Sequence, residues 1–161
     1  MKRLFLFIGT LLIFISACGS DDLKAFVSDF NKNADRYNIQ LLDKDDFGEI
    51  EDEEYMSWRE LYDSDDYSID AKYEDGESLS GYYLVIDRGQ PIEEFEGNGF
   101  KASLSIAKAL GLDHKKFIRE LGASFNEGSH SYVDKDYRVS FSYSGEESLT
   151  SVGTIINFDK Q

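Results

Sequence analysis

Histidine and cysteine, which often serve as general base and nucleophile in enzymes, are scarce in this sequence. The 161 residues include two histidines, His114 and His130, and one cysteine, Cys18. No serine stands in a Gly-x-Ser-x-Gly turn, which presents the nucleophile in many hydrolases, and no His-Glu-x-x-His pattern offers a zinc site. We therefore predict no catalytic residue. We interpret His114, in the first turn of a predicted helix, and His130, in a serine-rich loop, as exposed surface residues.

Residues 43–54 are the one segment whose carboxylates follow a metal-binding spacing. The segment resembles an EF-hand calcium loop at these positions: Asp43, Asp45, Gly48, Ile50, Glu51 and Glu54. However, Phe47 stands where the third ligand should be, and a complete EF-hand needs a following helix, whereas residues 56–62 favour a strand. Two interpretations stay open: weak calcium binding, at about 10⁻⁴–10⁻³ M, or an ordinary solvated acidic loop. We predict no cofactor and no metal ligand.

Negative charge is concentrated in one part of the chain. The formal net charge is −15, and residues 43–77 hold 16 acidic and 3 basic residues. This excess excludes non-specific nucleic-acid binding, which requires a surplus of Lys and Arg. Four aromatic residues are interleaved with these acids as candidate interface anchors: Tyr55, Trp58, Tyr62 and Tyr67. We hypothesise that the segment recognises a basic protein surface; alternatively, these aromatics are the buried face of a strand meander.

The N-terminus has the three parts of a secretory signal. Lys2 and Arg3 are followed by the apolar run 4–15, which is shorter than the roughly 20 residues that a membrane-spanning helix needs. At Ile15-Ser16-Ala17-Cys18 the segment resembles the lipobox of bacterial membrane lipoproteins. That resemblance implies cleavage after residue 17 and acylation of Cys18, with palmitate among the expected chains. The alternative is an ordinary signal peptide that leaves a free thiol.

These features predict three parts: a signal peptide over 1–17, a lipid-anchored tether over 18–22 and a single acidic α+β domain over 23–161. Loss of Lys2 and Arg3 changes the net charge from −15 to −17. The overall pattern resembles small lipoproteins of Gram-positive bacteria and their prophages. It implies a non-catalytic binding module on the outer face of the cytoplasmic membrane. Its expected partners are the bilayer, through acylated Cys18, and a basic protein. An extracytoplasmic enzyme is the alternative.

Hydrophobic periodicity predicts the elements of the domain. An apolar stripe with helical spacing predicts a helix over 22–37, and two short helices are expected over 100–111 and 113–122, the second capped by Asp113. Alternation predicts strands over 67–73, 81–87, 139–143 and 152–158, the last two joined by a turn at 144–147, and residues 39–42 are expected as a further short strand. Residues 56–62 fit either a strand paired with 67–73 or a helix, and we favour the strand. The strands follow one another in runs, and the helices are grouped between these runs, which predicts an α+β fold. We expect a single antiparallel sheet packed by an N-terminal helix and a central two-helix segment.

Overall fold

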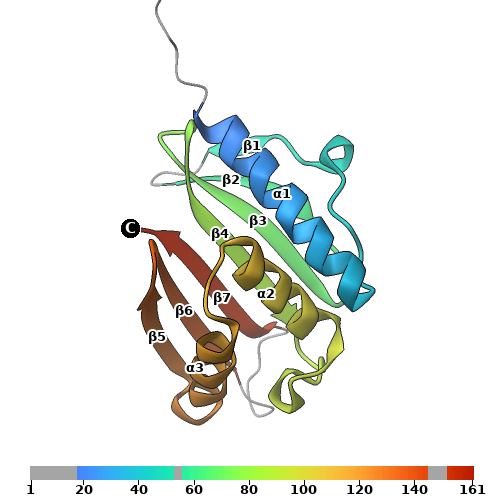
Figure 1. The fold of residues 1–161 in the computed structure, drawn as a ribbon, viewed down its shortest axis with the longest axis vertical. Helices are drawn as coiled ribbons and strands as arrows, with labels where there is room; N and C mark the ends of the chain where they lie inside the picture. Colours follow the sequence, from blue (N-terminus) through green and yellow to red (C-terminus); the bar gives the residue numbers. More distant parts are fainter. Residues whose placement is uncertain (1–17, 53–55, 145–151) are drawn as a thin grey trace, which may run out of the picture.

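A computed structural model describes residues 18–52, 56–144 and 152–161 of the chain (Figure 1). These residues form one seven-stranded antiparallel sheet in the order β1-β2-β3-β4-β7-β6-β5, with three α-helices packed against it. The predicted α+β fold with a single antiparallel sheet is confirmed. No helix in this described part is both long enough and apolar enough to cross a membrane.

The elements follow one another along the chain in a simple order. The helices are α1 (Cys18–Tyr37), α2 (Gly97–Ala109) and α3 (His114–Glu127), with short 3₁₀ helices η1 (Lys44–Asp46) and η2 (Ile92–Glu94). The strands are β1 (Ile50–Asp52), β2 (Ser57–Tyr62), β3 (Tyr67–Glu74), β4 (Ser78–Asp87), β5 (Ser129–Asp134), β6 (Tyr137–Tyr143) and β7 (Val152–Lys160).

All three predicted helices are present at the predicted positions, but the residues at which they begin and end differ from the prediction. α1 begins at Cys18, so the residues 18–22 expected to form a tether are helical. Asp113 caps α3 as predicted, because its carboxylate accepts hydrogen bonds from the Lys115 and Lys116 amides at 2.9 and 3.1 Å. The predicted end of α3 at Gly122 is wrong. The helix continues to Glu127 because its apolar face continues onto the sheet, and Gly128, at φ 73°, ends it.

The strand predictions are also confirmed, with one exception and two omissions. Residues 39–42 are not a strand, because the Leu42 backbone bonds to the side chain of Asn31 on α1. Strands β1 and β5 were not predicted, and β5 contains His130, which we had placed in a loop. The predicted turn at 144–147 lies mostly outside the described residues.

The helices cover one face of the sheet through aromatic contacts. Phe26 of α1 stacks on Tyr82 of β4 at 3.7 Å between ring centroids, and Phe117 of α3 lies 5.5 Å from Phe141 of β6. Gly99 brings α2 onto β4, because a Cβ at that position would come within 2.4 Å of Ile86. Side chains alternate along each strand, so the opposite set points to the face that carries no described helix.

Candidate binding surfaces at the β1–β3 end of the sheet

Acidic and aromatic side chains meet on the sheet face opposite the helices. In the strand register Glu51 lies opposite Trp58, Glu60 opposite Asp70, and Asp70 opposite Tyr83. Because directly opposite residues point to the same side of a sheet, these five side chains share one surface. We call this set, Glu51, Trp58, Glu60, Asp70 and Tyr83, the acidic face.

The raised pKa of the Asp70 carboxyl reflects the negative charge gathered on this surface. Burial, followed by repulsion from Glu60, Asp63 and Glu51, raises the pKa of its carboxyl to about 6. These three neighbours come from β1, from β2 and from the β2–β3 turn, so charge that is clustered in sequence is also clustered in space. Like charges opposite each other destabilise a sheet, which makes the Glu60–Asp70 pair costly to keep.

Two aromatic rings lie among these carboxylates. Trp58 and Tyr83 meet edge to face with their ring centroids 5.3 Å apart, and both are half-buried. The buried Lys72 ammonium lies 5.6 Å from the Trp58 ring centroid. It pairs with the Asp159 carboxylate of β7 and lies 3.4 Å from the Asn157 amide oxygen. The aromatic pair therefore rests on a fixed polar support.

The aromatics singled out in the sequence divide between surface and core. Trp58 lies half-buried on the acidic face. Tyr62 lies opposite the core residue Ile69 and packs against the core, and Tyr67 is 2% exposed, so the predicted role of Tyr67 as an anchor is wrong and Tyr62 is not on the acidic face. Tyr55 lies outside the described residues. Tyr83 replaces Tyr67 as the second surface aromatic, because in β4 the neighbouring Tyr82 points to the helices.

Most carboxylates of the acidic segment are exposed, as a recognition surface requires. The exposed ones are Asp43, Asp45, Asp46, Glu49, Glu51, Asp52, Glu60, Asp63, Asp65, Glu74, Asp75 and Glu77. Asp66 differs, because its carboxylate accepts hydrogen bonds from the Gln90 and Asn98 side-chain amides, both at 2.7 Å. Asp66 therefore fixes the loop before α2 and is a structural residue.

The calcium-loop interpretation of 43–54 does not fit the fold. Asp43 accepts a hydrogen bond from the Asp45 amide at the start of η1, and the chain then enters β1. The segment after the loop is strand β2 and not the exit helix of an EF-hand, because β1 and β2 pair as an antiparallel edge. Across the described residues, no three His, Cys, Asp or Glu side chains gather closely enough to hold a metal; Glu54 lies outside them.

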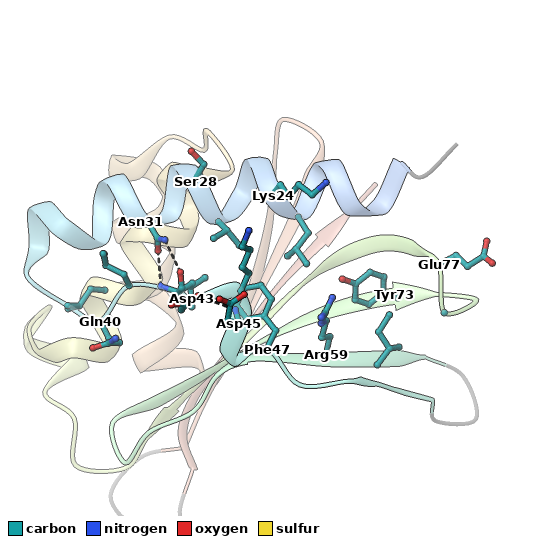
Figure 2. Close-up of a pocket in the computed structure, with 18 of the residues that line it drawn as sticks. Lys24, Ser28, Asn31, Gln40, Asp43, Asp45, Phe47, Arg59, Tyr73 and Glu77 are labelled. Atoms are coloured by element: carbon teal, nitrogen blue, oxygen red, sulfur yellow. Dashed lines mark hydrogen bonds between the residues drawn. The ribbon is translucent and has the colours of Figure 1, made fainter. Parts of the chain in front are cut away.

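A groove of about 1420 Å³ opens on the other side of the same strands, beneath α1 (Figure 2). Its walls come from α1, from residues 38–47, from one residue each of β1, β2 and β3 (Ile50, Arg59 and Tyr73) and from the β3–β4 turn at residues 76–77. Figure 2 shows Phe47, Arg59 and Tyr73 rising toward the helix from the loop and the sheet. The groove exists because α1 packs against β4 and leaves the outer strands uncovered.

Two sets of hydrogen bonds fix the walls of this groove. The Asn31 side chain donates to the Leu42 carbonyl at 2.9 Å and accepts from its amide at 2.8 Å, as the dashed lines in Figure 2 show. Arg59 Nε donates to the Gly48 carbonyl at 2.9 Å, and its guanidinium lies 5.6 Å from the Phe47 ring centroid. A preformed groove of this kind is typical of ligand sites.

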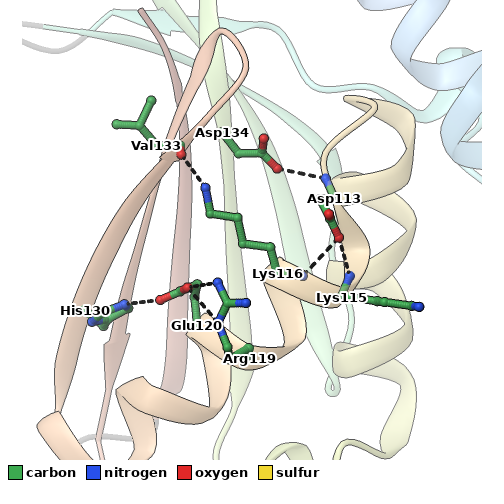
Figure 3. A network of polar contacts seen from close by, with 8 residues as sticks. All are labelled: Asp113, Lys115, Lys116, Arg119, Glu120, His130, Val133 and Asp134. Carbon is green, nitrogen blue, oxygen red and sulfur yellow. Dashed lines mark hydrogen bonds and ion pairs between the residues drawn. The ribbon is translucent and has the colours of Figure 1, made fainter.

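A third polar cluster joins α3 to the edge strand β5 (Figure 3). The Asp134 carboxylate accepts from the Asp113 amide at 2.8 Å, and Lys116 Nζ donates to the Val133 carbonyl at 2.8 Å. These contacts involve backbone groups of both elements. The cluster therefore secures the last strand of the sheet.

His130 belongs to this cluster and is not the exposed residue that we predicted; His114 is exposed. The His130 ring nitrogens lie 2.7 Å from Glu120 and 3.0 Å from Glu127, and its side chain is 23% exposed. The hydrogen bond to Glu120, reinforced by Glu127, raises the pKa of His130. Both ring nitrogens face carboxylates, which leaves neither directed at a serine hydroxyl.

Comparisons of the chain with protein-family models, with curated proteins and with solved structures found no match. We therefore infer function from the acidic face and the groove themselves.

Proposed function

We propose that the chain is a lipid-anchored, non-catalytic binding module on the outer face of the cytoplasmic membrane, and that its acidic face recognises a basic protein surface. Acylated Cys18 would hold the module on the bilayer. The net negative charge of the mature chain would repel anionic lipid headgroups and keep the domain facing outward. The bilayer and the basic protein are thus the two partners.

The pairing of Glu60 with Asp70 is the observation that carries this proposal. Two carboxylates directly opposite each other on neighbouring strands cost stability, and Asp70 is half-buried besides. Groups with strongly perturbed pKa values gather at functional sites. A basic partner that reaches this surface would relieve the repulsion, so recognition supplies a physical reason for the arrangement.

Trp58 and Tyr83 suit the centre of such an interface. Aromatic residues are frequent among the residues that dominate binding energy, while surrounding charges steer the encounter and set its rate. The exposed acids around the aromatic pair fit the second role. The acidic face thus combines anchors and a steering field on one surface.

Cys18→Ala is expected to abolish lipid anchoring. Since only the acylated sulfur would attach the module to the bilayer, cells given an alkyne-labelled palmitate should label the wild-type chain and not the variant. The variant should also leave the membrane fraction. A matched change within the signal, Ser16→Ala, keeps a small residue two positions before Cys18, and this variant should retain the label. Equal labelling of wild type and Cys18→Ala would refute the anchor.

Neutralising the acidic face is expected to slow association with the basic partner. A Glu51→Gln, Glu60→Gln, Asp63→Asn variant should associate about tenfold more slowly at low salt, because electrostatic steering depends on the local field. Asp66 is left unchanged because it anchors the loop before α2. The measurement is the association rate at several ionic strengths, with the screening length about 10 Å at 0.1 M.

The control variant for that experiment removes three exposed acids outside the acidic face, Glu93→Gln and Glu94→Gln in η2 and Glu96→Gln before α2. It removes as many negative charges as the acidic-face variant and should leave the association rate within a factor of two. If both variants slow association equally, total charge alone matters and the acidic face is not the recognition surface. Indifference of the rate to salt would lead to the same conclusion.

A further inference from the structure

We propose that the groove beneath α1 binds a long-chain fatty acid, with the hydrocarbon chain on its apolar walls and the carboxylate on Arg59. This site is separate from the acidic face. Ile50 and Arg59 lie opposite each other in the register and point to the helix side of the sheet, whereas Glu51 and Trp58, one residue along, point to the other side. The inference therefore goes beyond the proposed function.

The walls of the groove expose apolar side chains that a folded chain usually buries. On α1, the half-buried Val27 and the buried Leu23 line one wall. Leu41 is 43% exposed and Ile50 is 40% exposed, and these are two of the four most exposed large hydrophobic residues in the described part. Exposed apolar side chains that line a concave surface are typical of ligand sites. An apolar ligand would shield both residues from water.

The basic residues of the acidic segment are placed to complement a negative charge in this groove. Residues 43–77 contain only three of them, and two, Lys44 and Arg59, line the groove. Throughout the described residues, neither of these two forms an ion pair with a carboxylate. Because none of the described carboxylates of this acidic segment pairs with either cation, we infer a ligand that supplies the anion.

Arg59 is held in a position to receive that anion. Its Nε donates to the Gly48 carbonyl at 2.9 Å, and the guanidinium lies 5.6 Å from the Phe47 ring centroid. A guanidinium has five N–H donors, so these contacts leave others for a carboxylate. Paired N–H donors and a carboxylate form one of the strongest hydrogen-bonded pairs in proteins.

The charges at the rim favour a fatty acid over other amphiphiles. Asp43, Asp45 and Glu77 line the groove together with the cations, so a doubly charged phosphate headgroup would meet more repulsion than a single carboxylate. A peptide would bring many unpaired backbone groups against the apolar walls, which is costly. The groove volume, about 1420 Å³, exceeds the 300–1,000 Å³ typical of small-molecule sites and suits an elongated chain.

Calorimetric titration with dodecanoate tests the proposal. The protein is the chain from residue 18 with Cys18→Ser, which keeps the whole described core from Leu23 to Phe158 and needs no detergent. Dodecanoate should bind with one-to-one stoichiometry and more tightly than dodecanol, which has the same chain and no charge. Arg59→Gln should weaken dodecanoate binding about tenfold and leave dodecanol unchanged. The control Arg138→Gln, an exposed arginine on β6, should change neither.

Ile50→Asn provides a second variant at an exposed position, where the fold tolerates the change, and it should weaken both ligands. Circular dichroism checks folding in each case. Equal affinity for dodecanoate and dodecanol, or dodecanoate binding that survives Arg59→Gln in the folded protein, would overturn the proposal. So would the absence of binding. Self-association that Ile50→Asn abolishes, without fatty-acid binding, would assign the groove to a second copy of the chain.

Discussion

Replacing Asp70 with asparagine is expected to stabilise the fold by about 1–2 kcal/mol at pH 7 while slowing association with the basic partner. Burial and the neighbouring acids Glu60, Asp63 and Glu51 raise the pKa of this carboxyl to about 6, so its ionised form is disfavoured in the folded chain. A shift of one pKa unit corresponds to 1.36 kcal/mol, and solvent screening at a half-buried site reduces the sum. Asparagine removes the charge and keeps the size.

The gain from Asp70→Asn should depend on pH with a defined sign. A carboxyl whose pKa is raised on folding binds its proton more tightly in the folded state, so its contribution to stability is present at low pH. That contribution is lost as pH rises through about 6. In urea unfolding, the variant should therefore have a larger free energy of unfolding than wild type at pH 7–8, and this difference should disappear below about pH 4.

Opposite signs for stability and binding would identify Asp70 as a functional charge, because groups that serve recognition are often kept at a cost in stability. The matched control is Asp136→Asn, an exposed acid in the β5–β6 turn, which should change stability by less than about 0.5 kcal/mol. If Asp70→Asn destabilises the fold at pH 7, our account of its environment is wrong. If it stabilises the fold and leaves association unchanged, Asp70 takes no part in recognition.

Truncating Lys72 to alanine is expected to destabilise the fold by about 2–4 kcal/mol. The Lys72 side chain is 7% exposed and that of its partner Asp159 is 35% exposed, so the variant leaves a partly buried carboxylate without its counter-ion. Trp58 also loses the cation beneath its ring. Thermal and urea unfolding measure the loss, and the near-ultraviolet circular dichroism of the single tryptophan should change with it.

A double variant separates charge from packing at this site. Lys72→Met with Asp159→Leu removes both charges and keeps the volume, and it should recover most of the lost stability, because an apolar pair can replace a buried ion pair. Lys32→Ala, which breaks an exposed pair with Asp29, should cost less than about 1 kcal/mol. Equal losses for Lys72→Ala and Lys32→Ala would show that Lys72 does not support the aromatic pair.

The helices and strands that could be predicted from the sequence are those whose apolar residues recur with a clear helical or strand period. The apolar stripe of α1 and the alternation in β3, β4 and β6 follow directly from burial on one side. β1 and β5 lack that signal. All three residues of β1 are exposed. The sequence of β5, SHSYVD, does not alternate between apolar and polar residues, and neither does that of β1. Their strand conformation comes from pairing with β2 and β6, which no local pattern records.

The candidate surfaces, too, could be predicted from the sequence only in part. The concentration of acids in 43–77 was visible in the sequence, since charge is a property of residue types. Which aromatics would accompany them was not, because Tyr67 and Tyr83 differ only in the side of the sheet to which each points. The groove was missed altogether. It depends on how α1 crosses the sheet and on the bond between Asn31 and Leu42, and both are tertiary features.

Photo-crosslinking in intact cells tests the central claim most directly. A photoreactive residue at position 60 samples the acidic face, and one at position 131 samples the far edge of the same sheet face, because Glu60, Asp70, Tyr83, Asn157, Ser140 and Ser131 form one row across the strands. We predict a basic protein crosslinked from position 60 and not from 131, and lost when Glu51 and Asp63 are neutralised. The same product from both positions, or one that survives neutralisation, would contradict recognition through the acidic face.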